Sequence, residues 1–535
     1  MGTPSGVFAA SDEQAFCQPG AEWEDRAPYR GGRHRYAYVG RAVTPGASAA
    51  GAISVPAARL AEVSRAGRRS SIHALLALGG LAACAGCAPA TPPRAPDVVL
   101  VSIDSLRADR LGAYGASRDT SPAIDRLAAE GARFETVVAP TSWTLPSHVT
   151  LFTGLSISGH RVLGKLDRLD PERRTLAQHF ANAGYRTAAF VSSPFLHRAF
   201  GFDRGFAVYR NFGASEALGE ALPARPVHLA SHADRTADRV VDAARRWWSD
   251  RPTPDPRPAF LFVHLWDPHY DYAPPPPWDS IFDPDYAGTL DASHYERNRS
   301  ITAGMPARDL EHLRALYDGE IRWTDTQVAA LLGALAGRGD LDHSIVCLVS
   351  DHGEEFFEHG RKGHMKSLFE ESVRVPWILR HPPRVPAGTV VRGLASLEDV
   401  SPTLLELAGL PPLAEATGRS RVPDLEGRPL TERPELLILG GAAALRGPGW
   451  KIVRKPGGRS FYYDLRGDPG ERLPEPAARV APEALAALES RLESDRHHAD
   501  SLRWSAPQSV RLDEATRARL RELGYVEDES EGEGE

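Results

Sequence analysis

The segment DVVLVSIDS, residues 97–105, joins an unbroken apolar run to an aspartate. Such a run, rich in β-branched residues and without polar alternation, is typical of a strand buried on both faces of a parallel sheet. Ligands of open α/β sheets bind beyond the carboxyl ends of the strands. Asp104, which directly follows the run, is therefore a candidate functional residue.

Around this strand, the chain alternates between two kinds of segment. Apolar runs predict further strands at residues 186–191, 259–265, 344–350 and 375–380. Helical patterns predict helices at residues 121–131, 175–183, 233–248 and 309–336. This alternation predicts an α/β fold, with a large, mostly parallel sheet flanked by helices on both faces.

The length of 535 residues exceeds what one compact core needs, so we expect more than one unit. The catalytic domain is assigned to residues 97–410, and a Pro- and Gly-rich linker to 411–430. A smaller C-terminal α+β subdomain follows at 431–525, with strands expected at 435–439, 450–454 and 460–465 and helices at 482–495 and 513–523. The acidic tail, 526–535, is expected to be disordered.

Residues 67–96 have the pattern of an export signal followed by a tether. Arginines precede an apolar stretch at 72–83, which is too short to span a bilayer. The sequence Leu-Ala-Ala-Cys ends at Cys84, and Cys87 follows, so a lipoprotein-type anchor is expected at one of these cysteines. This predicts a protein of the bacterial cell envelope, either lipid-anchored or periplasmic or extracellular.

Because such a signal belongs at the start of a chain, residues 1–66 are interpreted as a disordered or non-native extension. The alternative is a disordered extension followed by an internal apolar helix.

The net charge argues against nucleic-acid binding, and the counts of cysteine and lysine add two further observations. With a net charge of −7, no nucleic-acid partner is expected. The four cysteines lack the spacing of a disulfide framework or zinc ribbon, and Cys347, in an apolar run, is expected to be a small buried hydrophobe. The chain has only five lysines, which draws attention to Lys362 and Lys366 in one polar loop.

Three more segments bring polar side chains to the edge of the sheet that Asp104 marks. They are Asp351 and His352 after strand 344–350, His264, Asp267 and His269 at the end of strand 259–265, and Thr144 in the turn before a helix expected to begin near Pro146. Carboxylates and imidazoles bind divalent cations, and a hydroxyl beside a cation becomes a usable nucleophile. Helix N-terminal amides would hold an anion nearby. Alone, each residue could be a cap, a turn or a solvated side chain, but their convergence favours a metal-dependent site.

The same motifs resemble those of the sulfatases, a family within the alkaline phosphatase superfamily. TLPSHVTLFTG, residues 144–154, aligns with the sulfatase signature Cys-x-Pro-Ser-Arg-x-x-Leu-x-Thr-Gly. The other matching segments, in the family's order, are DVVLVSIDSLRADRLGAYG (97–115), TLAQHFANAGYRTAAFVS (175–192), FVHLWDPHYDYAPP (262–275), LVSDHGEEFFEHG (348–360), LFEESVRVPWIL (368–379) and FYYDLRGDPGE (461–471). The resemblance implies an alkaline phosphatase-like fold and an ester hydrolase.

The resemblance also implies roles for individual residues. The implied metal ligands are Asp104, Thr144, Asp351 and His352, around one divalent ion, which is Ca²⁺, Mn²⁺ or Zn²⁺. The implied catalytic residues are Thr144, His148, His269, His364 and Lys366. In this scheme Thr144 is the nucleophile, His269 contacts the anionic oxygens of the ester, and His364 or Lys366 assists there or protonates the leaving group. Lys362 is a third choice for that last role, and His359 is an outer-shell candidate.

Departures from the family pattern bear on the activity. Sulfatases oxidise Cys or Ser at the nucleophile position to formylglycine, whereas Thr144 cannot be so oxidised because its β-carbon carries a methyl group. His148 stands where the signature has Arg, and Ser105 where many sulfatases have a second acidic ligand. Less negative charge at the site makes Mn²⁺ or Zn²⁺ as suitable as Ca²⁺.

Three functions are therefore open. The first is hydrolysis or transfer of phosphate esters or diesters through Thr144, as in related phosphodiesterases and transferases that use an unmodified threonine. The second is sulfate ester hydrolysis without formylglycine. The third is a catalytically inactive member that binds an anionic glycan or lipid. The expected partner is a small-molecule, glycan or lipid head-group ester.

Overall fold

The computed structural model describes residues 94–213, 236–252, 255–501 and 508–510, together with residues 514 and 517. These residues fall within one compact unit that spans residues 89–535. The expected export signal with Cys84 and Cys87, the N-terminal extension and the acidic tail lie outside the described residues, as does nearly all of the helix expected at 513–523. Among the described helices, none has both the length and the apolar character needed to cross a bilayer.

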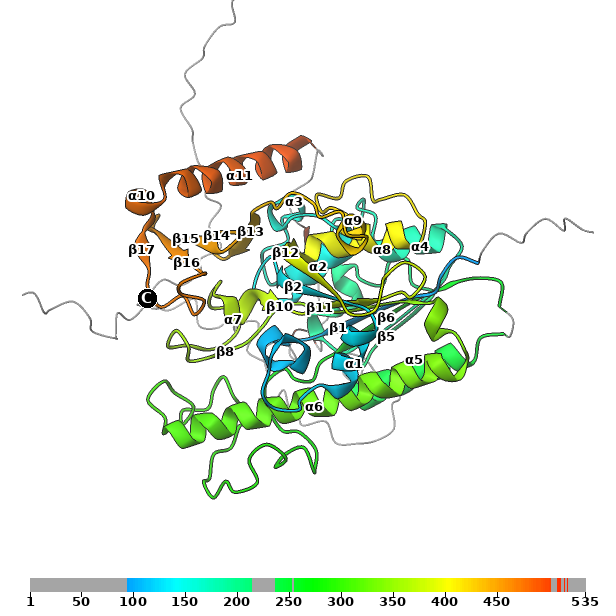
Figure 1. Cartoon of the computed structure of the whole chain (residues 1–535), viewed down its shortest axis with the longest axis horizontal. Coiled ribbons are helices and arrows are strands. Elements are labelled where there is room, and N and C mark those ends of the chain that lie inside the picture. Colours follow the sequence, from blue (N-terminus) through cyan, green and yellow to red (C-terminus); the bar gives the residue numbers. More distant parts are fainter. Residues whose placement is uncertain are drawn as a thin grey trace, which may run out of the picture. The chain divides into compact units, whose positions relative to one another are not determined.

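Nine strands of the described chain form the central sheet. In spatial order they are β10 (Arg374–Val375), β2 (Ala132–Val138), β11 (Trp377–Arg380), β7 (Ile345–Ser350), β1 (Val98–Ile103), β6 (Ala259–Leu265), β4 (Arg186–Val191) and β5 (Val208–Asn211), and β12 (Thr389–Ser396) also pairs with β2 (Figure 1). Strands β7, β1, β6, β4 and β5 run parallel to one another. β11 is antiparallel to both β7 and β2, so the sheet is mixed but mostly parallel, as expected.

The apolar run that marked the first strand is buried on both faces. Val98 and Leu100 pack into one hydrophobic cluster, whereas Val99, Val101 and Ile103 pack into another on the opposite face. Successive side chains of a strand point to opposite faces, so a strand without polar alternation needs a cover on each side. Ser102, the one polar residue of β1, lies on the same face as Val98 and Leu100 by this alternation.

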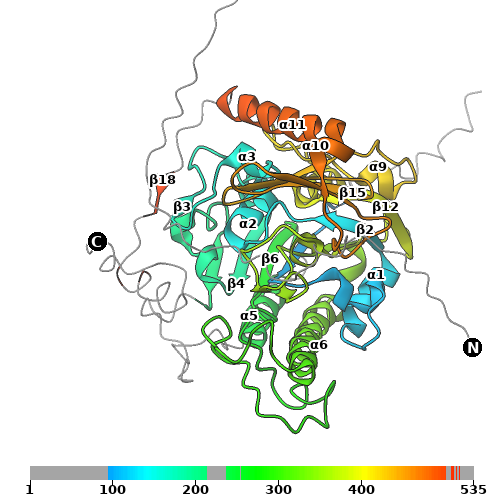
Figure 2. The same ribbon diagram turned by 90° about the vertical axis from the view of Figure 1, so that its left-hand side faces the viewer.

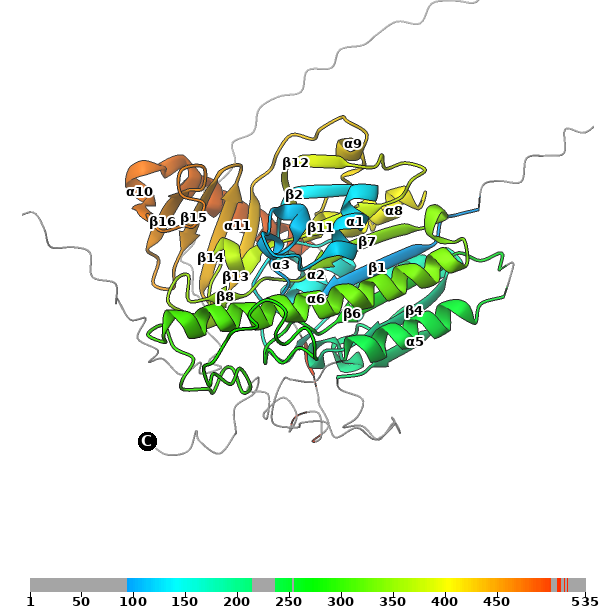
Figure 3. The same ribbon diagram turned by 60° about the horizontal axis from the view of Figure 1, so that its bottom comes forward.

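Helices supply both covers. One face carries α1 (Pro122–Glu130), α5 (Ala237–Ser249) and α6 (Ala307–Gly337), which run along the near side of the sheet in Figure 3. The other face carries α2 (Thr144–Thr153), α4 (Leu176–Asn182) and α8 (Val400–Leu407). Short helices α3 (Ile157–His160), α7 (Glu370–Val373) and α9 (Val422–Leu425) complete the main part of the fold. The predicted α/β class is confirmed.

A second, antiparallel sheet follows in the sequence. Its strands, in spatial order, are β13 (Glu435–Leu439), β14 (Ala442–Gly447), β15 (Trp450–Arg454), β16 (Ser460–Asp464) and β17 (Glu475–Pro476). After α10 (Ala477–Val480), the long helix α11 (Pro482–Ser501) crosses one face of this sheet (Figure 2), where Leu488 packs against Leu445 and Ile452. The opposite face packs on the central sheet, and there Leu437 and Ala444 meet Val138 and Val373.

A buried lysine joins the second sheet to the main part of the fold. Lys451 of β15 is fully buried, and its Nζ atom lies 2.8 Å from a carboxylate oxygen of Glu370 and 2.8 Å from one of Glu471. The same atom donates to the carbonyl of Leu368 at 3.0 Å. Glu370 begins α7, and the backbone of α7 accepts hydrogen bonds from the amides of residues 353 and 354, just after His352. The ion pairs therefore support the segment that follows β7.

Several strands were not expected from the sequence. β2, β5 and β12 extend the central sheet, and β14 and β17 extend the second one. β2 reads ARFETVV, in which polar residues interrupt the apolar ones, so it lacks the continuous run by which its neighbours were recognised. The helix α8 lies just before the stretch interpreted as a linker, and the short helix α9 lies within it.

Candidate functional site

The first part of the site is the end of β1. Asp104 is fully buried, and its amide donates to the carbonyl of Leu265 at 2.9 Å, which continues the pairing with β6. Its Oδ1 atom accepts a hydrogen bond from the Ser105 hydroxyl at 2.9 Å. Ser105 has the left-handed backbone conformation, with φ of 56°, which residues other than glycine adopt infrequently. This turn aims the Ser105 amide at Oδ1 of Asp351, 3.2 Å away.

The neighbouring strand β7 supplies the second part. Oδ1 of Asp351 also accepts from the amide of His352 at 2.9 Å, so this oxygen is held by two backbone donors. Nδ1 of His352 lies 2.9 Å from the carbonyl of Gly353, which requires a proton on Nδ1 and leaves the lone pair on Nε2. Nε2 lies 3.5 Å from Oδ2 of Asp351 and 3.6 Å from Oδ1 of Asp104.

Thr144 is the third part, and its place corrects the expectation. The helix α2 begins at Thr144 rather than near Pro146, so the hydroxyl stands on the first helical residue rather than in a preceding turn. Proline in the first turn is compatible with this start, because amides there lack partners within the helix. Oγ1 of Thr144 lies 3.3 Å from Nε2 of His352. Only 2% of Thr144 is exposed.

Asp104, Asp351 and His352 together fit a divalent cation. One ligand atom of each residue lies within 4.8 Å of the others. Within the described part of the chain, Oδ2 of Asp104 and Oδ2 of Asp351 are buried without a hydrogen-bond partner. Buried carboxylate oxygens of this kind need either a proton or a cation. A cation placed among these atoms would satisfy both oxygens and the lone pair on His352.

Without a bound ion, the pKa values of the two aspartates also indicate that the site lacks a positive charge. Burial raises the pKa of Asp104 to about 6, against the opposing effects of His352 and the hydroxyls of Ser105 and Thr144. Burial and the Asp104 carboxylate also raise the pKa of Asp351. Two carboxyl groups held close in a buried site resist ionisation, and a bound cation reverses that effect.

Two further histidines lie beneath these residues. His148 of α2 and His264 of β6 are both fully buried, with ring centroids 5.0 Å apart. His148 is held by Ser102 Oγ, 3.1 Å from its Nε2, and by the Thr144 carbonyl, 2.9 Å from its Nδ1. Burial lowers the pKa of each ring to about 4, so both are neutral near pH 7. His264 was seen in the sequence only as a residue at a strand end and received no role.

His364 and His269 continue the site away from the sheet. The ring of His364 lies 4.4 Å from that of His352 and 4.9 Å from that of His269, between ring centroids. His269 stacks on Trp266 at 3.9 Å. Nδ1 of His364 lies 3.3 Å from a carboxyl oxygen of Glu354, whose pKa burial raises well above its usual value. Glu354 was not recognised in the sequence, where it is one of several acidic residues in the loop.

The other candidates in the loop have partners elsewhere. Nζ of Lys366 lies 2.8 Å from a carboxylate oxygen of Glu296, and Nζ of Lys362 donates to the carbonyls of Tyr295 and Asn298. Nδ1 of His359 lies 2.6 Å from Glu371, and its Nε2 lies 3.2 Å from the carbonyl of Glu471, toward the second sheet. Thus His364, rather than either lysine, is the member of this loop whose side chain packs against His352, with the two rings tilted by 36°.

Asp267 has a structural role. Its Oδ2 atom accepts hydrogen bonds from the amides of Thr236 and Ala237 at 3.3 and 3.1 Å, at the start of α5. A carboxylate there satisfies amides that a helix leaves without partners.

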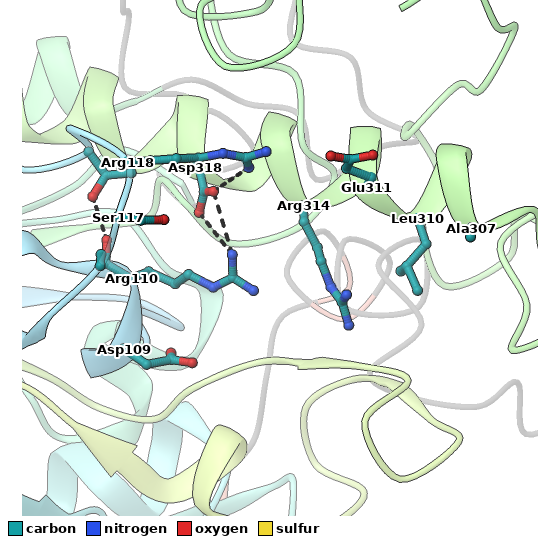
Figure 4. Close-up of a pocket in the computed structure, with 11 residues that line it drawn as sticks. Asp109, Arg110, Ser117, Arg118, Ala307, Leu310, Glu311, Arg314 and Asp318 are labelled. Atoms are coloured by element: carbon teal, nitrogen blue, oxygen red, sulfur yellow. Dashed lines mark hydrogen bonds and ion pairs between the residues drawn. The ribbon is translucent and has the colours of Figure 1, made fainter. Parts of the chain in front are cut away.

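A pocket of about 450 Å³ lies between α6 and the segment after β1, and it contains none of the site residues (Figure 4). Three of its charged side chains are paired with one another, and two more pair with residues outside its lining. Arg110 and Arg118 both reach Asp318, at 3.5 and 2.6 Å. Charges balanced in this way give no argument for an anion site there.

Comparison with known proteins agrees with the motifs. The sulfatase family model matches residues 96–410. An arylsulfatase of Clostridium perfringens is 26% identical over 436 residues, which cover 70% of this chain and 89% of the relative. Arylsulfatase K of Bos taurus is 26% identical over 454 residues, covering 75% of this chain and 81% of the relative.

Solved structures share the fold. A phosphonate monoester hydrolase of Agrobacterium radiobacter has a TM-score of 0.60 at 24% identity, over 76% of this chain and 96% of its own. A protein solved in complex with its substrate D-glucosamine-2-N,6-O-disulfate has a TM-score of 0.63 at 19% identity, over 76% of this chain and 98% of its own. The family match, the order of the motifs and the geometry of the site agree: the chain belongs to the sulfatase family of ester hydrolases.

Proposed function

We propose that the protein hydrolyses or transfers phosphate esters, including diesters, with the unmodified Thr144 hydroxyl as nucleophile. The observation that carries the proposal is the position of Thr144. It begins α2, is buried, and lies 3.3 Å from Nε2 of His352, beside the cation-binding residues. A threonine cannot supply the aldehyde hydrate that sulfatases use, but its hydroxyl can attack phosphorus directly.

Two features of the chain would bind the phosphoryl group. The N-terminal end of α2 offers backbone amides and the positive end of the helix dipole to an anion next to Thr144. His269, stacked on Trp266, lies on the other side of His364 and would donate to a second oxygen. A divalent cation held by Asp104, Asp351 and His352 would lower the pKa of the hydroxyl and offset negative charge.

The chemistry requires two displacements. The Thr144 hydroxyl loses its proton to solvent as its oxygen forms a bond to phosphorus and the bond to the leaving oxygen breaks, and we assign to His364 the proton that the leaving oxygen takes up. Water or an acceptor alcohol then attacks phosphorus and returns a proton to His364, while the released Thr144 oxygen takes up a proton from solvent. Glu354, beside Nδ1, would orient the ring of His364, as carboxylates beside functional histidines do.

Sulfate ester hydrolysis without formylglycine is the second candidate, because the relatives at 26% identity carry sulfatase names. It is less suited to this site, since a threonine sulfate ester has no hydrate through which to collapse. A binding protein without turnover is the third candidate. It leaves the presence of a nucleophile beside the cation-binding residues unexplained.

A substrate panel distinguishes these candidates. The full chain, supplied with Mn²⁺, Zn²⁺ or Ca²⁺, would be assayed on aryl phosphate monoesters, aryl phosphate diesters and aryl sulfates. We expect kcat/KM for a phosphate substrate to exceed that for the sulfate by about 100-fold or more, a difference of about 2.7 kcal/mol in transition-state binding. Turnover of sulfates alone would reject the proposal. Anion binding with no turnover under any of the three metals would favour the third candidate.

We also propose that the enzyme acts at the bacterial cell envelope on a small-molecule, glycan or lipid head-group ester, with a lipid anchor at Cys84 or Cys87. The support is the apolar segment at 72–83 followed by these cysteines. In cells fed a labelled fatty acid, the wild-type chain should take up label. Exactly one of Cys84→Ser and Cys87→Ser should lose it, since only one cysteine becomes the new N-terminus. Label in neither the wild type nor either variant would contradict an anchor.

A further inference from the structure

The turn after Asp104 is held by a side chain from the opposite cover of the sheet. Tyr317 of α6 is 0% exposed, and its hydroxyl donates to the carbonyl of Ser105 at 2.7 Å. The same hydroxyl accepts a hydrogen bond from the amide of Arg107 at 3.0 Å. α6 covers the face of the central sheet that lies opposite to α2 (Figure 3). One oxygen atom of this helix therefore fixes backbone groups on both sides of Leu106.

The conformation of Ser105 depends on such contacts. Its φ of 56° lies in the left-handed region, which is unfavourable for a residue with a β-carbon, so the surrounding structure must maintain it. The Tyr317 hydroxyl is one support, and the Ser350 hydroxyl is another, because it accepts from the amide of Leu106 at 2.9 Å. Ser350 ends β7, and its hydroxyl donates to the carbonyl of His352 at 2.7 Å. Tertiary contacts, rather than local preference, thus determine how Ser105 is oriented.

Ser105 in this conformation contacts both aspartates of the cation site. Its hydroxyl donates to Oδ1 of Asp104 at 2.9 Å, and its amide donates to Oδ1 of Asp351 at 3.2 Å. Each bond holds one oxygen of a carboxylate, and Oδ2 of each aspartate has no hydrogen-bond partner among the described residues. Donors that hold one oxygen in this way orient a carboxylate so that its other oxygen can bind a cation.

We propose that Tyr317 is a positioning residue of the metal site. Its hydroxyl holds Ser105 in the left-handed conformation, from which Ser105 orients the two aspartates around one divalent cation. The hydroxyl touches neither aspartate, so it acts through Ser105. The inference concerns cation binding, so it goes beyond the proposed phosphate chemistry and does not require it.

The alternative is that Tyr317 only packs in the core. Its ring lies 5.4 Å from the ring of Tyr272 and 5.0 Å from that of Phe356, between centroids. Packing requires the aromatic ring, whereas orientation of the turn requires the hydroxyl. Tyr317→Phe keeps the ring and removes the hydroxyl, so it separates the two roles.

Cation affinity of the purified full chain, measured by calorimetry without substrate, tests the proposal. Zn²⁺, Mn²⁺ and Ca²⁺ would each be titrated alone into the wild type and the variants. For the ion that the wild type binds most tightly, Tyr317→Phe should bind about 10- to 100-fold more weakly, the loss typical when a partner of a metal ligand is removed. Ser105→Ala removes only the hydroxyl that holds Asp104 and should lose about 10-fold.

Tyr114→Phe is the matched control. The Tyr114 hydroxyl makes the same pair of backbone hydrogen bonds, because it donates to the carbonyl of Trp377 at 3.1 Å and accepts from the amide of Trp377 at 2.9 Å. These bonds hold β11 rather than the turn after Asp104. Loss of this hydroxyl should therefore lower stability in a similar way but leave cation affinity as in the wild type.

Three results would overturn the proposal: unchanged cation affinity in folded Tyr317→Phe, an equal loss of affinity in Tyr114→Phe, or a wild type that binds none of the three ions. Ser105→Ala tests the same chain of contacts at its other end. If Tyr317→Phe does not fold, unchanged affinity in Ser105→Ala would overturn the proposal. Calorimetry needs no substrate, so absence of turnover in the substrate panel leaves these results unaffected. Phosphate turnover together with unchanged affinity in both variants would reject only the role of Tyr317.

Discussion

Thr144→Ala is expected to lower kcat for a phosphate ester by about 10³- to 10⁶-fold, the range that follows removal of a catalytic nucleophile. Alanine removes the only atom of residue 144 that can attack phosphorus. It keeps the helix start, since the N-cap residue of α2 is Trp143, outside the substitution, and makes no side-chain capping hydrogen bond. The measurement is steady-state kinetics on the best substrate of the panel, with zinc affinity measured in parallel.

Thr144→Ser is the matched control. Serine keeps the hydroxyl and loses one methyl group from a site that is 2% exposed, so it should retain most of the activity and should lose about 1 kcal/mol of stability. A covalent phosphoryl group on Thr144, trapped by acid quench and located by mass spectrometry, would be present in the wild type and absent from Thr144→Ala. Full activity in Thr144→Ala would show that another residue or water attacks the substrate.

Asp351→Asn is expected to abolish metal-dependent turnover while stabilising the metal-free protein. The variant keeps Oδ1, which accepts from the amides of Ser105 and His352, and replaces the unpartnered Oδ2 with an NH₂ group 3.5 Å from Nε2 of His352. It loses one of two anionic ligands, so cation affinity should fall by more than about 100-fold. It also removes a buried charge, so the free energy of unfolding without metal should rise by about 1–3 kcal/mol near neutral pH.

The pH dependence of that gain follows from the sign of the pKa shift. Burial and Asp104 raise the pKa of Asp351 in the folded protein above its unfolded value, so the neutral acid is favoured by folding. The wild type without metal is then penalised only as the pH rises above about 4, the pKa of an unfolded aspartate. Urea unfolding at about pH 4 and about pH 7.5 should show the gain at the higher pH and little at the lower one.

Asp267→Asn provides the control, because Asp267 is another buried aspartate whose pKa burial raises to about 6. It caps α5 and takes no part in the site, so this variant should bind zinc and turn over substrate as the wild type does. Loss of zinc binding in Asp267→Asn, or full zinc binding in Asp351→Asn, would contradict the ligand assignment.

The residues that could be predicted from the sequence share one property. Asp104 and Asp351 each directly follow a continuous apolar strand, with His352 next after Asp351, and the carboxyl ends of parallel strands meet at one edge of the sheet. The positions of these three residues in the sequence therefore predicted that their side chains lie close together in the structure. Thr144 was placed near the site for a related reason, although the helix begins two residues earlier than expected.

The residues that were missed or left open depend on contacts that no local pattern encodes. His264 lies within an apolar strand, where a histidine is more often a core residue, and only its pairing with β1 brings it under Asp104. The choice among Lys362, His364 and Lys366 was open because three residues of one loop share the same neighbourhood in sequence. Glu296, from a distant segment, pairs with Lys366, while Glu354 holds His364. Tertiary contacts of this kind determine which side chain reaches the site.

The buried Lys451 shows that residues outside the family match support the candidate site. The family match stops at residue 410, yet the segment after His352 is hydrogen-bonded to α7, and Glu370 of α7 forms an ion pair with Lys451, which lies beyond that boundary. The part of the chain that the family model recognises is therefore shorter than the part that supports the site. A chain trimmed to residues 96–410 would keep the proposed site residues and lose Lys451 and Glu471, which pair with Glu370 of α7 and with each other.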